Sequence, residues 1–414
     1  MSDAVKTAPQ HAPQQQFAVR DGELCIRGEK LSLLAERVGQ TPFYAYDRAL
    51  IAARIHAVRQ VLPQGVHLHY AIKANPMPAL VGFVCPLVDG MDVASAGELK
   101  LALDAGADVR SIGFAGPGKR EAELRPAVAS GVLLHVESAR ELRALADAAQ
   151  ALGRPARVAL RINPDFELRG AGMHMGGGPK PFGIDAEQVP DLLRSMAQHG
   201  LVFEGFHVYP GSQNLRGEVI AESLRRSLDL VLRLAQDSPA PVRLVNLGGG
   251  WGIPYFPGER ALDLAPVASA LAQVQMDLGR ALPMARLVLE LGRYLVGEAG
   301  IYVARVIDRK VSRGQVYLVT DGGMHHHLAA SGNFGQVIRR NYPVAIGSRL
   351  QATDRETACV VGPLCTPLDV LADRMELAVA QPGDLVVVFQ SGAYGATASP
   401  QAFLGHPPCP EVLV

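Results

Sequence analysis

Short apolar segments alternate with amphipathic segments through the middle of the chain, from His67 to about residue 300. The apolar segments have the length and composition of β-strands, and the segments between them place apolar residues at helical spacing, as in 137–152 and 217–236. Eight parallel strands that alternate with helices close into a (β/α)8 barrel, which is the fold class that we predict. The predicted strands are residues 67–73, 89–95, 111–116, 132–138, 157–163, 201–209, 243–250 and 286–292.

The sequence changes character on both sides of this region. Residues 1–16 are rich in Pro, Gln and Ala and have too little apolar content to pack, which predicts a disordered tail. Residues 17–45 and 301–414 are β-like, and the former contain a hairpin pattern around Asp21-Gly22. Since 17–45 has no partner strands in the barrel, we expect it to join the C-terminal residues. The predicted organisation is a barrel at 46–300 and an all-β domain at 301–414 that includes 17–45.

Composition and charge narrow the class of protein. The 414 residues include 40 basic and 40 acidic side chains without a long run of one sign, so no electrostatic footprint for nucleic acid or an anionic membrane is present. No apolar run approaches the length of a membrane span, and the N-terminus lacks the pattern of a signal peptide. The five cysteines are scattered without CxxC spacing, which indicates neither a disulfide framework nor a zinc site. We expect a cytoplasmic protein with a small-molecule substrate.

Polar side chains and glycines collect at the carboxyl ends of the predicted strands, where barrels of this kind carry their active sites. A lysine in a partly dry barrel mouth can have its pKa lowered enough to form a Schiff base. Each residue alone has an ordinary structural explanation, but the whole set on one rim predicts an active site. The set is Lys73, Asp92, Ser95, Glu137, Arg161, His207, Gly248, Gly249, Gly250, Glu290 and Arg293.

The glycine triplet before Trp251 suggests the kind of ligand. It lacks the spacing of a dinucleotide site, but it follows the seventh strand, where barrels commonly bind phosphate through bare backbone N–H groups. A lysine for an imine, a carboxylate, a histidine and a phosphate loop together fit pyridoxal 5'-phosphate, which has an aldehyde, a ring nitrogen and a phosphate. A phosphate-sugar site would explain the glycines but not the other residues.

Seven motifs also carry a resemblance to a known family. They are YAIKANP, DVASAGEL, HVYPGSQN, NLGGGWGIP, ELGRYLVGEAG, GPLCTPLDVL and SGAYG. In order and spacing they resemble the motifs of the fold-type III pyridoxal phosphate decarboxylases, the group that contains diaminopimelate, ornithine and arginine decarboxylases. The resemblance covers about residues 40 to 400. It implies a TIM-like barrel with a C-terminal β domain, the alanine racemase-like fold, and an amino-acid decarboxylase that works through an external aldimine and a quinonoid.

The resemblance also implies roles for individual residues. Lys73 resembles the lysine that forms the internal aldimine, His207 the residue that stacks on the cofactor ring, and Glu290 the partner of the pyridine nitrogen. A carboxylate there keeps the ring protonated, so that the ring can accept electrons when carbon dioxide leaves. The other implied cofactor-binding residues are Asp92, Arg161, Ser212, Gly248, Gly249, Gly250, Gly292, Arg293 and Tyr394.

Cys365 in GPLC is placed by the same resemblance to reprotonate the product, from the neighbouring subunit. A homodimer with shared active sites is therefore implied. The alternative for Cys365 is a small buried apolar residue, which is a common role of free cysteine.

The chain departs from the diaminopimelate enzymes at two places that read the distal part of the substrate. Thr366 and Pro367 follow Cys365, where those enzymes usually have a glutamate. After DGGM the chain continues with HHHLAASGNFGQVIRRNYP instead of an Arg-Pro-x-Leu-Tyr segment. The sequence looks closer to the carrier-protein-linked L-glutamate decarboxylases and the exosortase-associated decarboxylases, with Arg339 or Arg340 available to a distal carboxylate or carbonyl.

Other functions and sites are alternatives to this one. A diaminopimelate decarboxylase of lysine biosynthesis is the main alternative, followed by an amino-acid racemase or a non-catalytic homologue. KANP differs from the racemase-like KANAYGHG, and the presence of Lys73, Glu290 and Cys365 argues against a non-catalytic protein. The run 325–327 is predicted to be a loop instead of a metal site, because adjacent histidines point in different directions. The glycine-rich 170–183 is long for a βα loop, as a lid would be.

Overall fold

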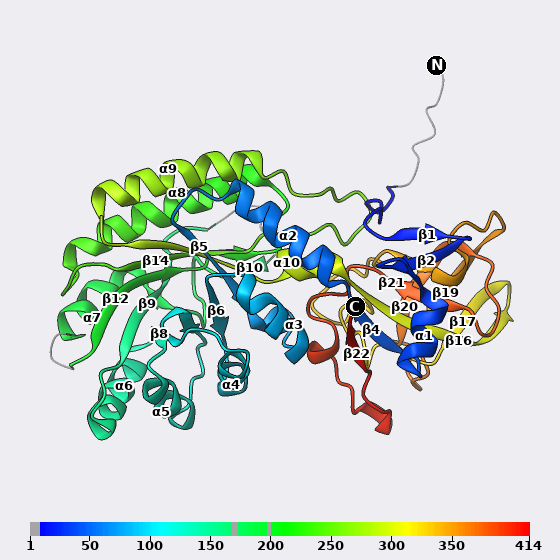
Figure 1. The fold of residues 1–414 in the computed structure, drawn as a ribbon, viewed down its shortest axis with the longest axis horizontal. Helices are drawn as coiled ribbons and strands as arrows, with labels where there is room; N and C mark the ends of the chain where they lie inside the picture. The colour runs from blue at the N-terminus through cyan, green and yellow to red at the C-terminus, as the bar shows by residue number, and fades with distance from the viewer. Residues whose placement is uncertain (1–8, 168–172, 197–199) are drawn as a thin grey trace, which may run out of the picture. The chain divides into compact units, whose positions relative to one another are not determined.

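The computed structural model describes residues 9–167, 173–196 and 200–414 (Figure 1). These residues form two compact units, which we describe separately. The barrel unit comprises Ala52–Gly252 and Leu262–Leu295. The β unit comprises the residues up to Ile51, Ile253–Ala261 and Val296–Val414.

All eight predicted barrel strands are present, and the predicted fold class is confirmed. Each strand pairs in parallel with the next one in the chain, and the last pairs with the first, so the sheet is closed. The strands are β5 (Val66–Ala71), β6 (Gly90–Val93), β7 (Ile112–Phe114), β8 (Leu133–Val136), β9 (Arg157–Asn163), β12 (Val202–Val208), β14 (Leu244–Gly249) and β15 (Arg286–Leu291). Three two-residue strands, β10 (Met173–His174), β11 (Ile184–Asp185) and β13 (Gly211–Ser212), lie in the connections.

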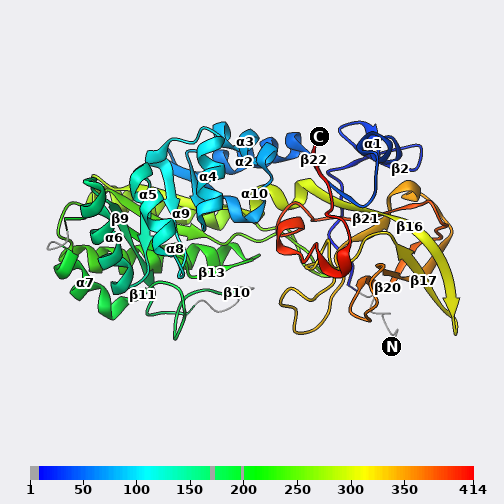
Figure 2. The same ribbon diagram turned by 90° about the horizontal axis from the view of Figure 1, so that it is seen from below.

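Helices cover the outside of the barrel strands. Figure 2 shows α4, α5 and α6 on one side, and α8 and α9 pack side by side on another (Figure 1). The two crossover helices predicted from the sequence are α6 and α8. The helices are α2 (Arg48–Val61), α3 (Pro78–Val84), α4 (Ala96–Asp104), α5 (Glu121–Ser130), α6 (Ala139–Leu152), α7 (Val189–Met196), α8 (Gly217–Leu234), α9 (Ala265–Ala281) and α10 (Arg293–Val296).

Local sequence explains why α6 begins and ends where it does. Ser138 is the N-cap, and its side chain accepts a hydrogen bond from the backbone N–H of Glu141 at 3.2 Å. The Glu141 carboxylate in turn accepts from the backbone N–H of Glu137 at 2.9 Å. Gly153 closes the helix in the left-handed conformation, at φ 59°. Such caps satisfy backbone groups that a helix end leaves without partners, and they fix the direction in which β8 enters α6.

The interior of the barrel is apolar at one level and polar at the next. A cluster of four buried apolar side chains, Leu133, Ala159, Leu244 and Val288, fills the lower level. Because side chains alternate along a strand, the residues two positions further on face the same interior, nearer the carboxyl ends. These are His135, Arg161, Asn246 and Glu290, all of them buried. The polar level is therefore the floor of the rim that the sequence predicts as an active site.

The β unit contains a mixed sheet and a small second sheet. The mixed sheet runs in the order β18-β21-β16-β17-β19-β20, and β4 pairs with β16 and β22. Its strands are β4 (Phe43–Tyr46), β16 (Gly300–Ser312), β17 (Gln315–Thr320), β18 (Val344–Ile346), β19 (Arg355–Val361), β20 (Val370–Ala378), β21 (Leu385–Val388) and β22 (Glu411–Leu413). The second sheet is formed by β1 (Ala18–Arg20), β2 (Glu23–Ile26) and β3 (Glu29–Lys30), and α1 (Leu31–Val38) follows it.

The N-terminal β-like segment and the C-terminal strands share one apolar core. Phe17, Leu24 and Phe43 belong to the same buried cluster as Ile301 and Val387. This is why the segment at 17–45 lies in the unit formed largely by 296–414.

Residues 9–16, part of the stretch expected to be a tail, have no helix or strand but do contact the β unit. Gln10 accepts a backbone hydrogen bond from Gly258 at 2.8 Å, and the His11 ring lies 2.8 Å from the Asn341 carbonyl. In the expected lid at 170–183, residues 170–172 lie outside the described residues. Within the described ranges, no helix is both long and apolar enough to cross a membrane.

Candidate active site

His207 and Glu290 form the centre of the polar level. His207 lies near the end of β12 and Glu290 near the end of β15, and their side chains are 1% and 7% exposed. The His207 Nε2 and Glu290 Oε2 atoms lie 3.4 Å apart, which is a charge contact without an aligned hydrogen bond. The Asn246 amide on β14, between these two strands, donates to Glu290 Oε2 at 3.2 Å. Asn246 was not among the site residues predicted from the sequence.

Glu290 remains ionised in this buried place. Burial alone would raise the pKa of its carboxyl group, but the charge interactions with His207 and Lys73 outweigh burial and hold the pKa well below its usual range. A permanently negative oxygen at the end of β15 is suited to hold a positively charged ring nitrogen.

Arg161 on β9 is held by Glu137, which directly follows β8. The Arg161 guanidinium donates to Glu137 Oε1 at 2.8 Å. The same carboxylate accepts from the backbone N–H groups of Gly116 at 2.6 Å and Gly183 at 3.0 Å. Burial raises the pKa of Glu137, but the charges of Arg161 and Lys119 and the hydrogen bonds from Gly183 and Arg161 together outweigh burial, and the net shift is downward. Glu137 thus ties three connections together at the carboxyl ends of the strands.

The sequence predicted that Lys73 ends the first barrel strand. In the structure, Lys73 instead lies in the turn that follows this strand. β5 stops at Ala71, and Ile72–Ala74 form one 3-10 turn. The turn is fixed by the Tyr70 hydroxyl, which donates to the Asn75 carbonyl at 2.9 Å, and by the Asn75 side chain, which accepts from the Met77 backbone at 3.1 Å. The exposed Lys73 places its Nζ 5.6 Å from the centre of the Tyr209 ring.

Tyr209 links the lysine to the predicted phosphate site. Its hydroxyl lies 3.0 Å from Ser212 Oγ, and its ring meets the His207 ring edge-on at 6.4 Å between centroids. Tyr209 lies between His207 and Ser212 in the HVYPGSQN motif. It therefore contributes a side chain to the rim, a role that was not predicted from the sequence.

The glycine triplet after β14 is a backbone turn that other residues could not form. Gly248 and Gly250 have φ of 67° and 73°, which strains any residue with a Cβ. A Cβ on Gly249 would lie 2.2 Å from the Glu290 carbonyl, and one on Gly250 would lie 2.0 Å from the Gly211 carbonyl. The Gly248 N–H already donates to the Asn246 side chain at 2.8 Å. The turn therefore brings bare backbone close to Ser212.

The remaining barrel residues of the predicted set also lie at or just after the carboxyl ends of barrel strands. Gly292 comes directly after β15, and a Cβ there would lie 2.8 Å from the Cβ of Ala74, so this glycine permits a close approach to the Lys73 turn. Arg293 begins α10, and Ser95 caps α4. Asp92 on β6 is 8% exposed and lies 3.2 Å from His69, an interaction that the sequence reasoning did not foresee.

Cys365 and Tyr394 lie in the β unit. Cys365 is exposed, in the loop between β19 and β20. Asp369 holds this loop, because its carboxylate accepts from the backbone N–H groups of Leu364 at 2.9 Å and Met324 at 2.6 Å. Tyr394 has a left-handed φ of 53°. Sequence inspection missed Asp369, although it stands only four residues after the cysteine.

Arg339 and Arg340 both have partners within the β unit. Arg339 donates to the Val370 carbonyl, and Arg340 lies 3.5 Å from Glu259 and 3.8 Å from the centre of the Phe256 ring. The loop that contains 325–327 consists of turns, as predicted. Over the described ranges, no group of three or more His, Cys, Asp or Glu side chains is arranged to hold a metal ion.

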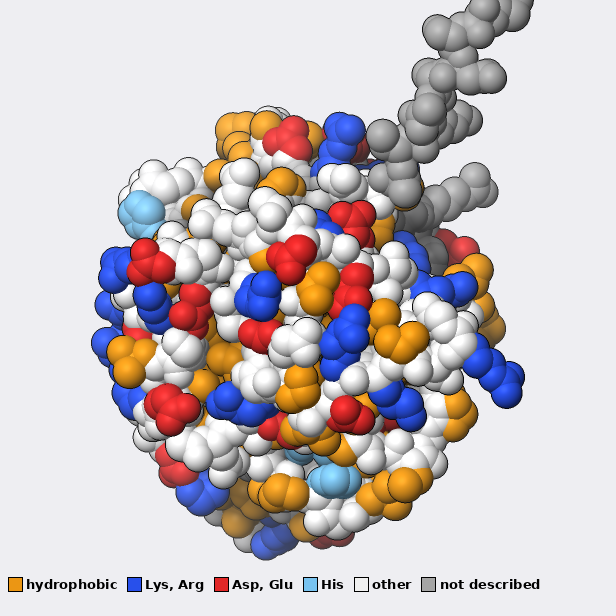
Figure 3. Space-filling model, turned by 90° about the vertical axis from the view of Figure 1, so that its right-hand side faces the viewer, with side chains coloured by type: hydrophobic (Ala, Val, Ile, Leu, Met, Phe, Trp, Pro, Cys, Tyr) orange, Lys and Arg blue, Asp and Glu red, His pale blue; other side chains and the backbone are white. Residues whose placement is uncertain are grey.

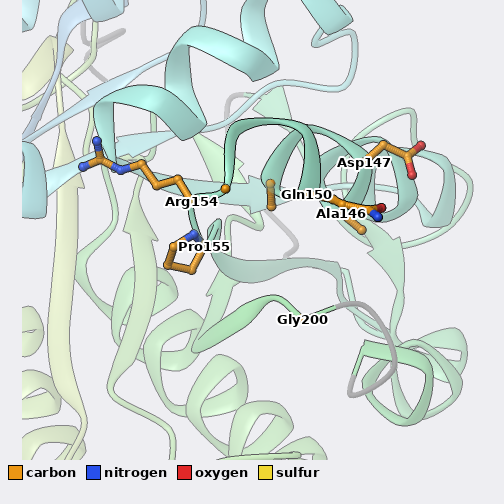
Figure 4. Close-up of a pocket in the computed structure, with 8 residues that line it drawn as sticks. Ala146, Asp147, Gln150, Arg154, Pro155 and Gly200 are labelled. Atoms are coloured by element: carbon orange, nitrogen blue, oxygen red, sulfur yellow. The ribbon is translucent and has the colours of Figure 1, made fainter.

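A surface hollow lies away from this site. It is lined by Ala146, Asp147 and Gln150 of α6 and by Gly153, Arg154 and Pro155 before β9 (Figure 4). That is the amino-terminal end of the strands, opposite the predicted rim.

On the face drawn in Figure 3, basic and acidic side chains are interspersed. The chemistry therefore points to the polar level of the barrel and not to the hollow.

The residues at the polar level fit pyridoxal phosphate. Both ring nitrogens of His207 are buried without an aligned hydrogen bond, as expected of a ring that is held for stacking. Glu290 offers a charge for the pyridine nitrogen, and Lys73 an amine for the aldehyde. The glycine turn offers backbone and Ser212 offers a hydroxyl for a phosphate, in a turn where a Cβ at Gly249 or Gly250 would clash with a neighbouring carbonyl.

Comparisons with known proteins agree with this fit. Residues 48–297 match the family model described as pyridoxal-dependent decarboxylase, pyridoxal binding domain. The L-glutamyl-[BtrI acyl-carrier protein] decarboxylase of Niallia circulans is 39% identical over 90% of this chain and 89% of its own. The diaminopimelate decarboxylase of Aquifex aeolicus is 34% identical over 95% of this chain and 91% of its own.

A solved structure shows the same fold. The diaminopimelate decarboxylase from M. jannaschii in complex with L-lysine superposes with a TM-score of 0.86 at 26% identity, over 96% of this chain and 92% of that one. The cofactor predicted from the sequence, pyridoxal phosphate, and the predicted enzyme class, a carboxy-lyase, are confirmed by these relatives. The chain belongs to the family of pyridoxal-dependent decarboxylases.

Proposed function

We propose that this pyridoxal phosphate-dependent decarboxylase acts on a glutamate-like amino acid or on an aminoacyl group tethered to a carrier protein. The observation that carries the reaction class is the placement of Lys73, the buried His207 and Glu290 pair, and the glycine turn on one barrel rim. The substrate class rests on the similarity to the L-glutamyl-[BtrI acyl-carrier protein] decarboxylase and on Thr366 and Pro367.

Each residue has a defined task in this proposal. When bound, the cofactor supplies an aldehyde that joins the substrate amine and a ring that accepts the electron pair left behind as carbon dioxide departs. Lys73 provides the amine that holds the aldehyde before the substrate arrives. Glu290 keeps the ring nitrogen protonated, and His207 covers one face of the ring. The Glu137 carboxylate fixes Arg161, so that its guanidinium is a rigid support beside His207.

The phosphate is proposed to be bound by backbone and side chains of the turn region. Gly249, Gly250 and Ser212 supply donors, and Tyr209 fixes the Ser212 hydroxyl at 3.0 Å. Asp92, Gly292, Arg293 and Tyr394 complete the proposed cofactor-binding set.

Cys365 is proposed to return a proton to the product carbon in the active site of a second subunit. Its exposed position on a loop held by Asp369 suits donation to another chain. The proposed assembly is a homodimer with shared active sites.

The dimer can be tested by mixing two inactive variants. Lys73→Ala and Cys365→Ala are each expected to be nearly inactive, but a mixture that exchanges subunits should form hybrid dimers with one intact active site. About a quarter of wild-type activity is expected when exchange is random, since half of the dimers are hybrid and each has one intact site of two. A mixture no more active than its parents would show that each site is built from one chain.

Substrate choice distinguishes this proposal from diaminopimelate decarboxylation. A distal ammonium group that enters a desolvated pocket needs an opposite charge beside it, because leaving the ammonium unpaired there costs several kcal/mol. Thr366 and Pro367 supply none. We therefore expect meso-diaminopimelate, ornithine and lysine to have a kcat/KM at least about a hundredfold below that of the true substrate.

The measurement is carbon dioxide release from a panel of L- and D-amino acids and carrier-bound aminoacyl groups. L-Glutamate, free and carrier-bound, tests the preferred class, and meso-diaminopimelate tests the alternative suggested by the 34% identical relative. Efficient turnover of meso-diaminopimelate would overturn the proposed substrate class and assign the chain to lysine biosynthesis.

A further inference from the structure

Two carboxylates are buried next to each other beneath the proposed cofactor site. Glu290 on β15 and Asp92 on β6 are 7% and 8% exposed. The strand between them is β5, on which His69 is the register partner of Glu290. The His69 Nδ1 and Asp92 Oδ2 atoms lie 3.2 Å apart. One imidazole therefore stands between two carboxylates that would otherwise face each other inside the barrel.

Two glycines make the room that this arrangement needs. A Cβ on Gly90 would lie 2.5 Å from His69 Nε2 and 2.3 Å from the Ser111 carbonyl. A Cβ on Gly113, the register partner of Asp92, would lie 2.6 Å from Asp92 Oδ1. Because real Cβ atoms do not approach other atoms so closely, both strands can take only glycine without a shift of these side chains. The interior is thus shaped around the His69 and Asp92 side chains.

Three polar atoms of the pair have no aligned hydrogen bond among the described residues. Over the described ranges, His69 Nδ1 and both carboxylate oxygens of Asp92 are buried without an aligned partner. Asn246 serves Glu290 and not Asp92. His69 is the group that most compensates the Asp92 carboxylate, with a smaller contribution from the charge of His207.

The electrostatics of two such carboxylates are unfavourable unless one is neutralised. Burial raises the pKa of Asp92 above its ordinary value; His69 opposes that rise, and the negative Glu290 adds to it. Groups this close titrate as a unit. The titratable or charged side chains around the pair are Glu290, His207, His135 and Lys73 toward the carboxyl ends, and His67, Arg110 and Arg286 toward the amino-terminal end of the strands.

We infer that His69 and Asp92 hold one proton between them, so that the pair is neutral overall and the negative charge beneath the cofactor ring is confined to Glu290. In this view His69 is a positioning residue, which acts on the ring nitrogen through the charge state of Asp92 and touches neither substrate nor cofactor. The inference rests on the proposed function in that it assigns Glu290 to the ring nitrogen. It goes beyond that function because it assigns a role to His69, which neutralises Asp92 so that this second carboxylate adds no negative charge near the ring.

The test compares His69→Asn, Asp92→Asn and the double variant, with His56→Asn on the exposed face of α2 as the matched control. The first readout is the absorbance of the bound cofactor as a function of pH. In His69→Asn the Asp92 carboxylate has no imidazole to compensate it once the pH exceeds its own pKa, so its charge should favour the protonated cofactor and raise the midpoint by about one pH unit. The double variant should return close to the wild-type midpoint, because the extra charge is gone.

The second readout is the unfolding temperature of the cofactor-free protein between pH 5 and 8. In His69→Asn the folded-state pKa of Asp92 lies above its unfolded value, so the folded protein holds the extra proton and stability falls as pH rises through that folded value. The double variant should lack this fall, and in His56→Asn the fall should occur at the lower pH of the wild-type protein, because His69 opposes the rise of the Asp92 pKa. His69→Gln, with a longer amide, replaces His69→Asn if the latter does not fold.

Either of two results would overturn the inference. One is a His69→Asn protein that keeps the wild-type pH dependence in both readouts. The other is a double variant that is as perturbed as His69→Asn, since the loss of the imidazole would then act through packing. Failure of the proposed function looks different: the wild-type protein would show no bound-cofactor band, while the unfolding series would still decide whether His69 and Asp92 share a proton.

Discussion

Lys73→Ala protein is expected to lose the absorbance band of covalently bound cofactor and to have no measurable decarboxylase activity. In the wild-type protein, borohydride should fix pyridoxal phosphate onto Lys73, and peptide mass mapping should find the label in the segment that contains residues 69–78. The reason is that the turn after β5 carries the Lys73 amine. Gly292, directly after β15, packs closely against Ala74 of the same turn. Labelling at another lysine would assign the aldehyde elsewhere.

The same substitution should leave the fold intact. Lys73 is exposed and its turn is held by Tyr70 and Asn75, neither of which changes. Lys100→Ala, on the exposed face of α4, is the matched control and should keep both the band and the activity. An unfolding temperature of Lys73→Ala far below that of Lys100→Ala would mean that the lysine has a structural role instead.

The barrel could be predicted because each of its strands has a recognisable pattern in the local sequence. β9 and β12 are buried at every position but the first and have an apolar majority of residues, as strands covered on both faces do, and α6 and α8 between strands carry one apolar stripe. Each polar residue at the end of such a strand alone has an ordinary structural explanation, but a whole set of them on one rim indicates chemistry. This made His207 and Glu290 visible from the sequence.

The contacts between those residues could not be predicted in the same way. Whether His207 meets Glu290, or His69 meets Asp92, depends on the register between strands that are far apart in the chain. His69 lies within an apolar strand and looks like an ordinary core histidine; only the pairing of β15, β5 and β6 puts it between two carboxylates. The glycines that make room for it look like strand interruptions until the neighbouring side chains are known.

Lys73 shows a third kind of limit. The sequence signal, an apolar run followed by Asn75 and Pro76, correctly predicted a change of direction. It could not distinguish a strand that ends at the lysine from a 3-10 turn that contains it, because the hydrogen bonds of Tyr70 and Asn75 decide between them.

Glu290→Gln should lower kcat by about two orders of magnitude or more while leaving cofactor affinity within about a factor of ten. The neutral amide has nearly the shape of the carboxylate, and its oxygen can still accept the hydrogen bond that Asn246 donates to Glu290 at 3.2 Å. What is lost is the negative charge, which the net lowering of the Glu290 pKa keeps present throughout the working pH range. A ring nitrogen without this partner gives up its proton more easily and accepts electrons less well.

The control for this variant is Glu204→Gln. Glu204 is also a buried glutamate on a barrel strand, but it pairs with Arg157 at 2.8 Å near the amino-terminal end of the barrel. It should lose some stability and little kcat. The measurements are kcat with the best substrate of the panel, cofactor affinity by titration, and the unfolding temperature of each variant. Unchanged turnover in Glu290→Gln would place Glu290 away from the ring nitrogen, whatever its burial. A loss of turnover that is equally large in Glu204→Gln would mean that the barrel tolerates no neutralised glutamate, so that the effect at residue 290 is structural.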